Sequence, residues 1–178
     1  MNEVLYATTI IVSLVIAYQD FKYRANSWFL FPILFIQVLI IGLINNASCK
    51  EFFLSTASNI FILVIQFLVV KIYFSVRKGR GISIVDHYLG LGDVLFLVIF
   101  SFAFSTFNFL LVYLVSLVIA LIGSTIFTGM KKMSTMKIPL AGYFSLILIS
   151  MLVLKLFSTT FSTYDDTLTR QYLYRWTL

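Results

Sequence analysis

Val94–Met130 reads VLFLVIFSFAFSTFNFLLVYLVSLVIALIGSTIFTGM and contains no charged residue. At about 1.5 Å rise per residue, one helix of this length would measure roughly 55 Å, whereas the hydrocarbon core of a bilayer is about 30 Å thick. The run is therefore long enough for two membrane spans. We expect the turn between them at the polar interruption Ser105-Thr106-Phe107-Asn108.

The composition of the whole chain points the same way. Of its 178 residues, 61% are hydrophobic and 11% are charged, against about 45–50% and about 25% in soluble domains. This excludes a soluble enzyme, a disordered chain and a nucleic-acid-binding module, and the single cysteine, Cys49, excludes a disulfide scaffold. The class that remains is an all-α, polytopic membrane protein, with lipid as its surroundings.

Charge-free runs indicate about six transmembrane helices within residues 1–157, followed by a tail over residues 158–178. The tail is predicted either as an interfacial helix or as a solvated segment. The first span lacks the features of a cleaved signal peptide, so we expect it to be retained. Besides the two spans in the long run, the expected spans are Val4–Gln19, Ala25–Cys49, Phe52–Val70 and Ile138–Phe157.

The basic residues predict the orientation in the membrane. The first, third and fifth loops and their helix ends carry nine of the 13 basic residues: Lys22, Arg24, Lys71, Arg77, Lys78, Arg80, Lys131, Lys132 and Lys137. Because basic loops stay in the cytoplasm, we expect these three loops inside and both termini outside.

Two aspartates occupy positions that are costly for a carboxylate. Asp20 ends the first span and Asp93 begins the fourth, so the alternation of spans places both at the cytoplasmic membrane boundary. One interpretation is structural: Asp20 pairs with Arg24, four residues on, and Asp93 caps its helix. Gly90 and Gly92, just before Asp93, leave the backbone open to another helix or to an extended peptide.

The other interpretation is catalytic. Two carboxyl groups held close together share a proton, because both cannot easily ionise at once. The ionised group takes a proton from water, which attacks a peptide carbonyl, and the protonated group donates to the carbonyl oxygen. This chemistry needs no metal, thiol or cofactor. The pair titrates as a unit, so neither residue is assigned the acid role.

Three segments carry a resemblance to a known family. They are Asp20-Phe21-Lys22-Tyr23-Arg24, Gly90-Leu91-Gly92-Asp93 and Lys137-Ile138-Pro139-Leu140-Ala141-Gly142. In order and spacing they resemble the motifs of type IV prepilin peptidases, membrane aspartic proteases of the GxGD type. The chain differs in having Asn26-Ser27-Trp28 where the family usually has Ile-Pro-Asn, and Leu95 where a lysine is frequent.

The resemblance implies a short, stand-alone peptidase without the cysteine-bearing region that accompanies N-methylation. It implies Asp20 and Asp93 as catalytic residues, with Gly90 and Gly92 as backbone support. The implied substrate is a pilin-like precursor with a basic leader, cleaved at the cytoplasmic face of a bacterial or archaeal inner membrane. Residues adjacent to the site, or available to substrate, would be Gln19, Arg24, Lys137 and Pro139.

Two other classes compete with this prediction. A small ion- or proton-coupled transporter would place charged residues near mid-membrane on several spans, and the sequence has none there. A non-catalytic membrane scaffold would tolerate the loss of either aspartate. The only histidine, His87, has no ligand cluster around it in the sequence and is expected on a loop surface.

Overall fold

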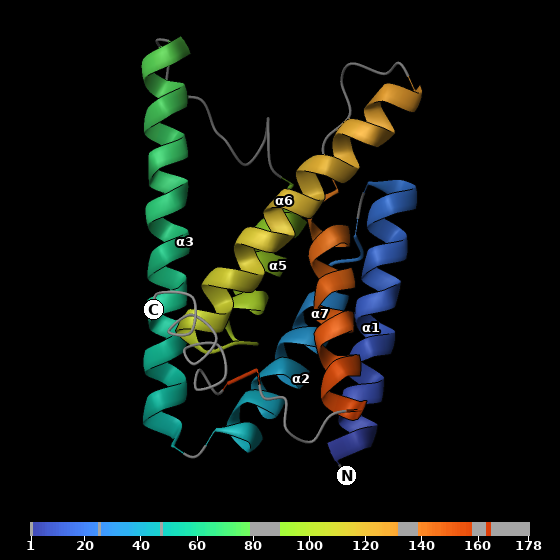
Figure 1. Ribbon diagram of the computed structural model, residues 1–178, viewed down its shortest axis with the longest axis vertical. Helices are drawn as coiled ribbons and strands as arrows, with labels where there is room; N and C mark the ends of the chain where they lie inside the picture. The colour runs from blue at the N-terminus through green and yellow to red at the C-terminus, as the bar shows by residue number, and fades with distance from the viewer. Residues whose placement is uncertain are drawn as a thin grey trace, which may run out of the picture.

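The computed structural model describes residues 2–24, 26–46, 48–78, 90–131, 139–157 and 163–164. In these residues the chain forms six α-helices, as the sequence predicts. They are α1 (Asn2–Tyr23), α2 (Leu30–Asn45), α3 (Cys49–Lys78), α5 (Leu91–Ser101), α6 (Thr106–Lys131) and α7 (Leu140–Phe157). The helices α1, α3 and α6 run in one direction, and α2, α5 and α7 run in the other (Figure 1).

Four of these helices, α1, α3, α6 and α7, are long and apolar enough to cross a membrane, which indicates a multi-pass membrane protein. The other two are shorter than a full membrane span. α2 has 16 residues and α5 has 11, which correspond to about 24 Å and about 17 Å of helix. The predicted second span, Ala25–Cys49, is too long at both ends: Cys49 already belongs to α3, and the chain between α1 and α2 forms a loop that is bonded to α1. Gln19 accepts a hydrogen bond from the Ser27 N–H there, at 2.9 Å.

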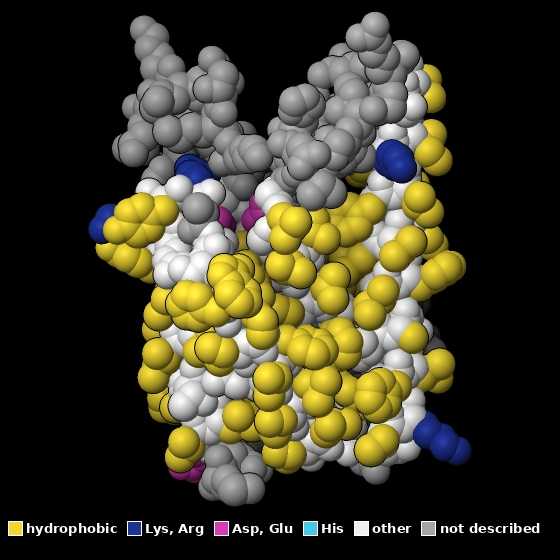
Figure 2. Space-filling model, turned by 180° about the vertical axis from the view of Figure 1, so that it is seen from behind, with side chains coloured by type: hydrophobic (Ala, Val, Ile, Leu, Met, Phe, Trp, Pro, Cys, Tyr) yellow, Lys and Arg dark blue, Asp and Glu magenta, His cyan; other side chains and the backbone are white. Residues whose placement is uncertain are grey.

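The packing places α7 among the other helices. It lies along α1 and also contacts α5 and α6, while α2 lies against α1 and α5 (Figure 1). α3 stands at the edge, against α5 and α6. The face seen in Figure 2 is largely apolar over the described residues, and exposed apolar residues include Leu54, Leu121 and Val76. An apolar exterior around a packed interior is the arrangement expected of helices surrounded by lipid.

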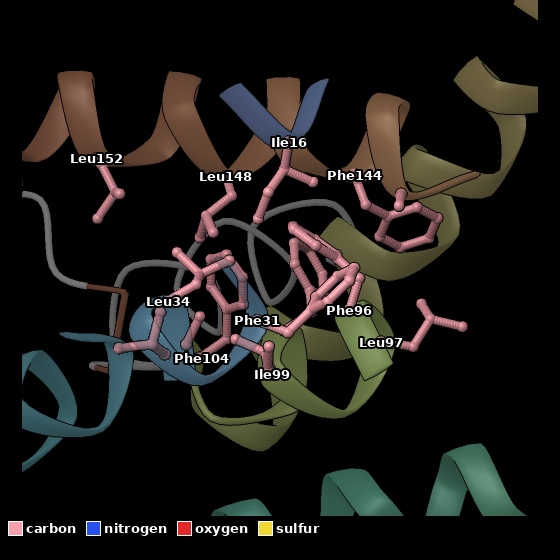
Figure 3. Packing of buried hydrophobic residues seen from close by; sticks show 14 of the residues in the cluster. Ile16, Phe31, Leu34, Phe96, Leu97, Ile99, Phe104, Phe144, Leu148 and Leu152 are labelled. Carbon is pink, nitrogen blue, oxygen red and sulfur yellow. The ribbon is translucent and has the colours of Figure 1, made fainter. Parts of the chain in front are cut away.

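The core is rich in phenylalanine. Phe100 of α5 lies 5.1 Å from Phe144 of α7, centroid to centroid, with the rings edge to face, and 4.9 Å from Phe104. Side chains from α1 and α7 point toward side chains from α2 and α5 (Figure 3). Ile16 and Leu34 are fully buried among them. This core joins α1, α2, α5 and α7, and three of them, α1, α5 and α7, carry the site described below.

The short helix α5 ends inside the protein, where its last carbonyl groups need donors. Nδ2 of Asn59 in α3 donates to the carbonyl oxygen of Ser101, the last residue of α5, at 2.9 Å, and to that of Phe104, in the turn that follows, at 3.0 Å. The Tyr164 hydroxyl donates to the Phe102 carbonyl at 2.9 Å. Burial raises the pKa of Tyr164 above its ordinary value, so this hydroxyl stays protonated and available as a donor.

The turn between α5 and α6 lies at residues 102–105, slightly before the predicted position. The difference arises because Asn108 belongs to the first turn of α6. Its side chain donates to the Thr163 carbonyl, at 3.2 Å, which also accepts the Ser105 N–H at 3.1 Å. Two residues of the predicted tail, Thr163 and Tyr164, thus pack on this turn. The rest of the predicted tail, over 158–162 and 165–178, lies outside the described residues.

Candidate active site

Asp20 and Asp93 lie together although they are far apart in the sequence. Asp20 stands in the last turn of α1 and Asp93 in the first turn of α5, and both side chains are buried. They are close enough for the charge of Asp93 to act on Asp20. Figure 2 shows acidic side chains next to each other near the upper end of the molecule. Two carboxyl groups from different helices therefore meet at one end of the bundle.

The start of α7 binds both carboxyl groups. The Ala141 N–H donates to Asp93 Oδ1 at 2.8 Å, and the Gly142 N–H donates to Asp20 Oδ2 at 2.6 Å. The first N–H groups of a helix have no partner within it and lie at the positive end of its dipole. Since the Cα atoms of adjacent residues are about 3.8 Å apart, consecutive amides hold the two carboxyl groups side by side.

The remaining two carboxyl oxygens also accept hydrogen bonds. The Gly90 N–H donates to Asp93 Oδ2 at 3.1 Å, and Asn26 Nδ2 donates to Asp20 Oδ1 at 3.3 Å. Asp93 therefore caps its own helix, as the structural interpretation expects, and also reaches α7. All four oxygens have an N–H donor, and Asn26 supplies the only one of these four bonds that comes from a side chain.

Glycine allows this close approach at two places. A Cβ atom added to Gly142 would lie 3.1 Å from Asp20 Oδ2 and 3.0 Å from the Phe21 ring. One added to Gly92 would lie 3.3 Å from the Phe31 ring and 3.5 Å from Asn26 Nδ2. Both distances to the rings are shorter than an ordinary carbon contact of about 3.5–4.0 Å. At these two positions, glycine main chain therefore packs directly against the carboxyl pair or the side chains beside it.

The other predicted residues have structural roles near the pair. Arg24 ends α1 in a left-handed conformation with φ of 55°, and its N–H donates to the Asp20 carbonyl at 3.1 Å. Its side chain is exposed. Gln19 holds the following loop through Ser27. Pro139 is buried and directly precedes α7, and its carbonyl accepts the Tyr143 N–H. Lys137 and His87 lie outside the described residues.

Sequence reasoning missed two kinds of site residue. Ala141 and Gly142 bind the carboxyl groups through their main chain, which leaves no side-chain signal, although both belong to the quoted segment at residues 137–142. Asn26 was read only as a departure from a motif. Its signal was a polar side chain six residues after Asp20, in the loop that must return past the end of α1.

In the part of the chain that the structure describes, no group of three or more His, Cys, Asp or Glu residues is arranged to hold a metal. Each carboxyl oxygen instead accepts an N–H group, and N–H groups at a helix start stabilise the negative charge of a carboxylate. The arrangement can stabilise negative charge on a carboxyl pair and keep the two groups at a fixed separation.

Comparisons with protein-family models, curated proteins and solved structures found no match to this chain. The resemblance to prepilin peptidases therefore stands on the three quoted segments. The carboxyl pair and its four donors stand on the geometry of this structure alone.

Proposed function

We propose that this chain is a membrane aspartic endopeptidase that removes the leader peptide of pilin-like precursors at the cytoplasmic face. The observation that carries the proposal is the binding of Asp20 and Asp93 by the consecutive amides of Ala141 and Gly142. An aspartic peptidase needs two carboxyl groups held within reach of one water molecule, and this arrangement supplies such a pair.

The reaction follows from one shared proton. The ionised carboxylate takes a proton from water as the water oxygen attacks the scissile carbonyl carbon, while the protonated carboxyl donates to the carbonyl oxygen. The tetrahedral intermediate then collapses as its C–N bond breaks. The amine leaves with the proton that the first carboxyl took from water, and a hydroxyl of the intermediate returns a proton to the second carboxyl. One water is consumed, and the pair again holds one proton.

The position of the pair fits the proposed substrate. Asp20 and Asp93 lie at helix ends rather than at mid-helix, so the bond that they reach lies at the end of a membrane helix. A pilin-like precursor has its cleavage site just before its hydrophobic helix, as the resemblance implies. The substrate helix would remain in the bilayer beside the apolar exterior, and its leader would extend into the cytoplasm.

The geometry gives less support to the competing classes. A cation site brings several oxygen ligands together, whereas among the described residues no group of three or more His, Cys, Asp or Glu is so arranged. A scaffold has no need for two buried carboxyl groups in mutual repulsion, because such burial costs stability unless it has a use.

The test is conversion of a co-expressed pilin-like precursor, followed by its size shift. We expect Asp20→Asn and Asp93→Asn each to abolish nearly all cleavage, and the double variant to be hardly worse, because groups that act as a unit are not additive. Glu51→Gln, which removes an exposed carboxyl at the start of α3, serves as the matched control and should cleave normally. Near-normal processing by either aspartate variant, at normal accumulation in the membrane, would reject the proposal in favour of a scaffold.

A further inference from the structure

Asn26 differs from the other groups that bind the carboxyl pair. Of the four donors found among the described residues, three are main-chain amides, whereas Asn26 donates through its side chain, at the longest of the four distances, 3.3 Å. Its loop is fixed on α1 because the adjacent Ser27 N–H donates to Gln19. The amide group of Asn26 is therefore placed beside Asp20 by bonds that do not depend on α7.

The carbonyl oxygen of the Asn26 side chain has no hydrogen-bond partner among the described residues. Asn26 Oδ1 is buried and accepts no hydrogen bond there. A buried acceptor without a donor is unfavourable. Four other buried side-chain atoms of the described residues also lack a partner, and Asn26 is the one whose amide also bonds to a carboxyl group of the pair. An unpaired acceptor beside a candidate catalytic carboxyl is best explained by a donor that arrives with a ligand.

The surroundings favour a peptide as that ligand. The lack of a side chain at Gly92 lets Asn26 approach the start of α5, since a Cβ there would lie 3.5 Å from Asn26 Nδ2 and 3.3 Å from the Phe31 ring. An extended peptide carries one N–H and one C=O per residue, and these groups need partners when they leave water. A side-chain amide that donates on one side and accepts on the other can join a carboxyl group to such a backbone.

We propose, on the basis of the peptidase function proposed above, that Asn26 bridges Asp20 and the substrate. Its Nδ2 holds Asp20 Oδ1, and its Oδ1 accepts a main-chain N–H of the precursor at a peptide bond beside the scissile one. Asn26 thereby sets the register of the substrate against the carboxyl pair.

The experiment uses synthetic precursor peptides in which one main-chain amide at a time, on either side of the scissile bond, is replaced by an ester. The ester keeps the shape but removes the N–H. We expect one ester position to lower kcat/KM about tenfold with the wild-type protein, equivalent to about 1.4 kcal/mol. With Asn26→Ala the same ester should cost less than twofold, because the acceptor is already gone.

Asn26→Gln is the second variant, should Asn26→Ala fail to accumulate. It keeps the amide but displaces it by one methylene group, so the coupling to the ester should again disappear. Equal ester costs in the wild type and in the variants, or esters that cost nothing at any position, would overturn the bridging role. Both results leave the peptidase function intact, because the all-amide peptide is still cleaved. A wild-type protein that does not cleave the all-amide peptide would overturn the proposed function and this inference with it.

Discussion

Replacing Gly142 with alanine tests whether the start of α7 holds the carboxyl pair in its working position. The new methyl carbon would lie 3.1 Å from Asp20 Oδ2 and 3.0 Å from the Phe21 ring. Both contacts are too short, so either Phe21 or the start of α7 must move. Phe21 packs edge to face on Tyr143 at 5.0 Å, which restricts its freedom. We therefore expect α7 to withdraw and the bond from the Gly142 N–H to Asp20, now 2.6 Å, to lengthen.

The size of the effect follows from that bond. A hydrogen bond to a charged group contributes about 1.5–3 kcal/mol, so losing it from the working geometry lowers the cleavage rate roughly 10- to 150-fold. The assay is the rate of precursor conversion per unit of protein accumulated in the membrane. Gly42→Ala is the matched control. A Cβ on Gly42 would also collide with a ring, that of Phe52, but these two residues lie on α2 and α3 rather than at the start of α7. Gly42→Ala should reduce stability but leave the rate per folded molecule unchanged. A Gly142→Ala protein that accumulates normally and cleaves at the wild-type rate would refute the role given to α7.

Two further predictions concern the fold. Asn59→Leu leaves the Ser101 and Phe104 carbonyls without their donor, so we expect a loss of about 1–3 kcal/mol in stability, measured as a lower Tm in detergent. The control, Ser58→Ala on the exposed side of α3, should change the Tm little. An unchanged Tm for Asn59→Leu would show that these bonds are not needed. For orientation, a membrane-impermeant thiol reagent should label the exposed Cys49 in intact cells and should not label a Ser83→Cys, Cys49→Ser protein; labelling of the latter from outside would reverse the predicted topology.

Much of the fold could be predicted because it depends on where apolar runs stop. The run Val94–Met130 is too long for one span, and it does divide, although at residues 102–105. The prediction placed the turn too late because Asn108 was read as a turn residue. In the structure its side chain satisfies the Thr163 carbonyl from within α6. A polar residue near a break can equally well serve the helix that follows, and the sequence alone does not distinguish the two roles.

The candidate site could be predicted only where side chains carry it. Asp20 and Asp93 stand out because a carboxylate at a membrane boundary is costly, and the structure brings both to one place. The groups that hold them are mostly main-chain amides, which every residue other than proline possesses. Ala141 and Gly142 gain their role from the position of α7 against α1 and α5, a tertiary relation that no local pattern specifies.

Because α5 is short, a bond at one of its ends affects the position of its other end. An apolar helix of 11 residues is too short to be fixed by the thickness of a bilayer, so its position along its own axis must be set by bonds at its ends. At the site end, Asp93 bonds to Ala141. At the other end, Asn59 donates to the carbonyl groups of Ser101, which ends α5, and of Phe104, in the turn that follows. Since Asp93 lies in the first turn of α5, a shift of the helix along its axis would move that carboxyl away from Asp20. The polar contacts of α3 thus contribute to the geometry of a carboxyl pair that they do not touch.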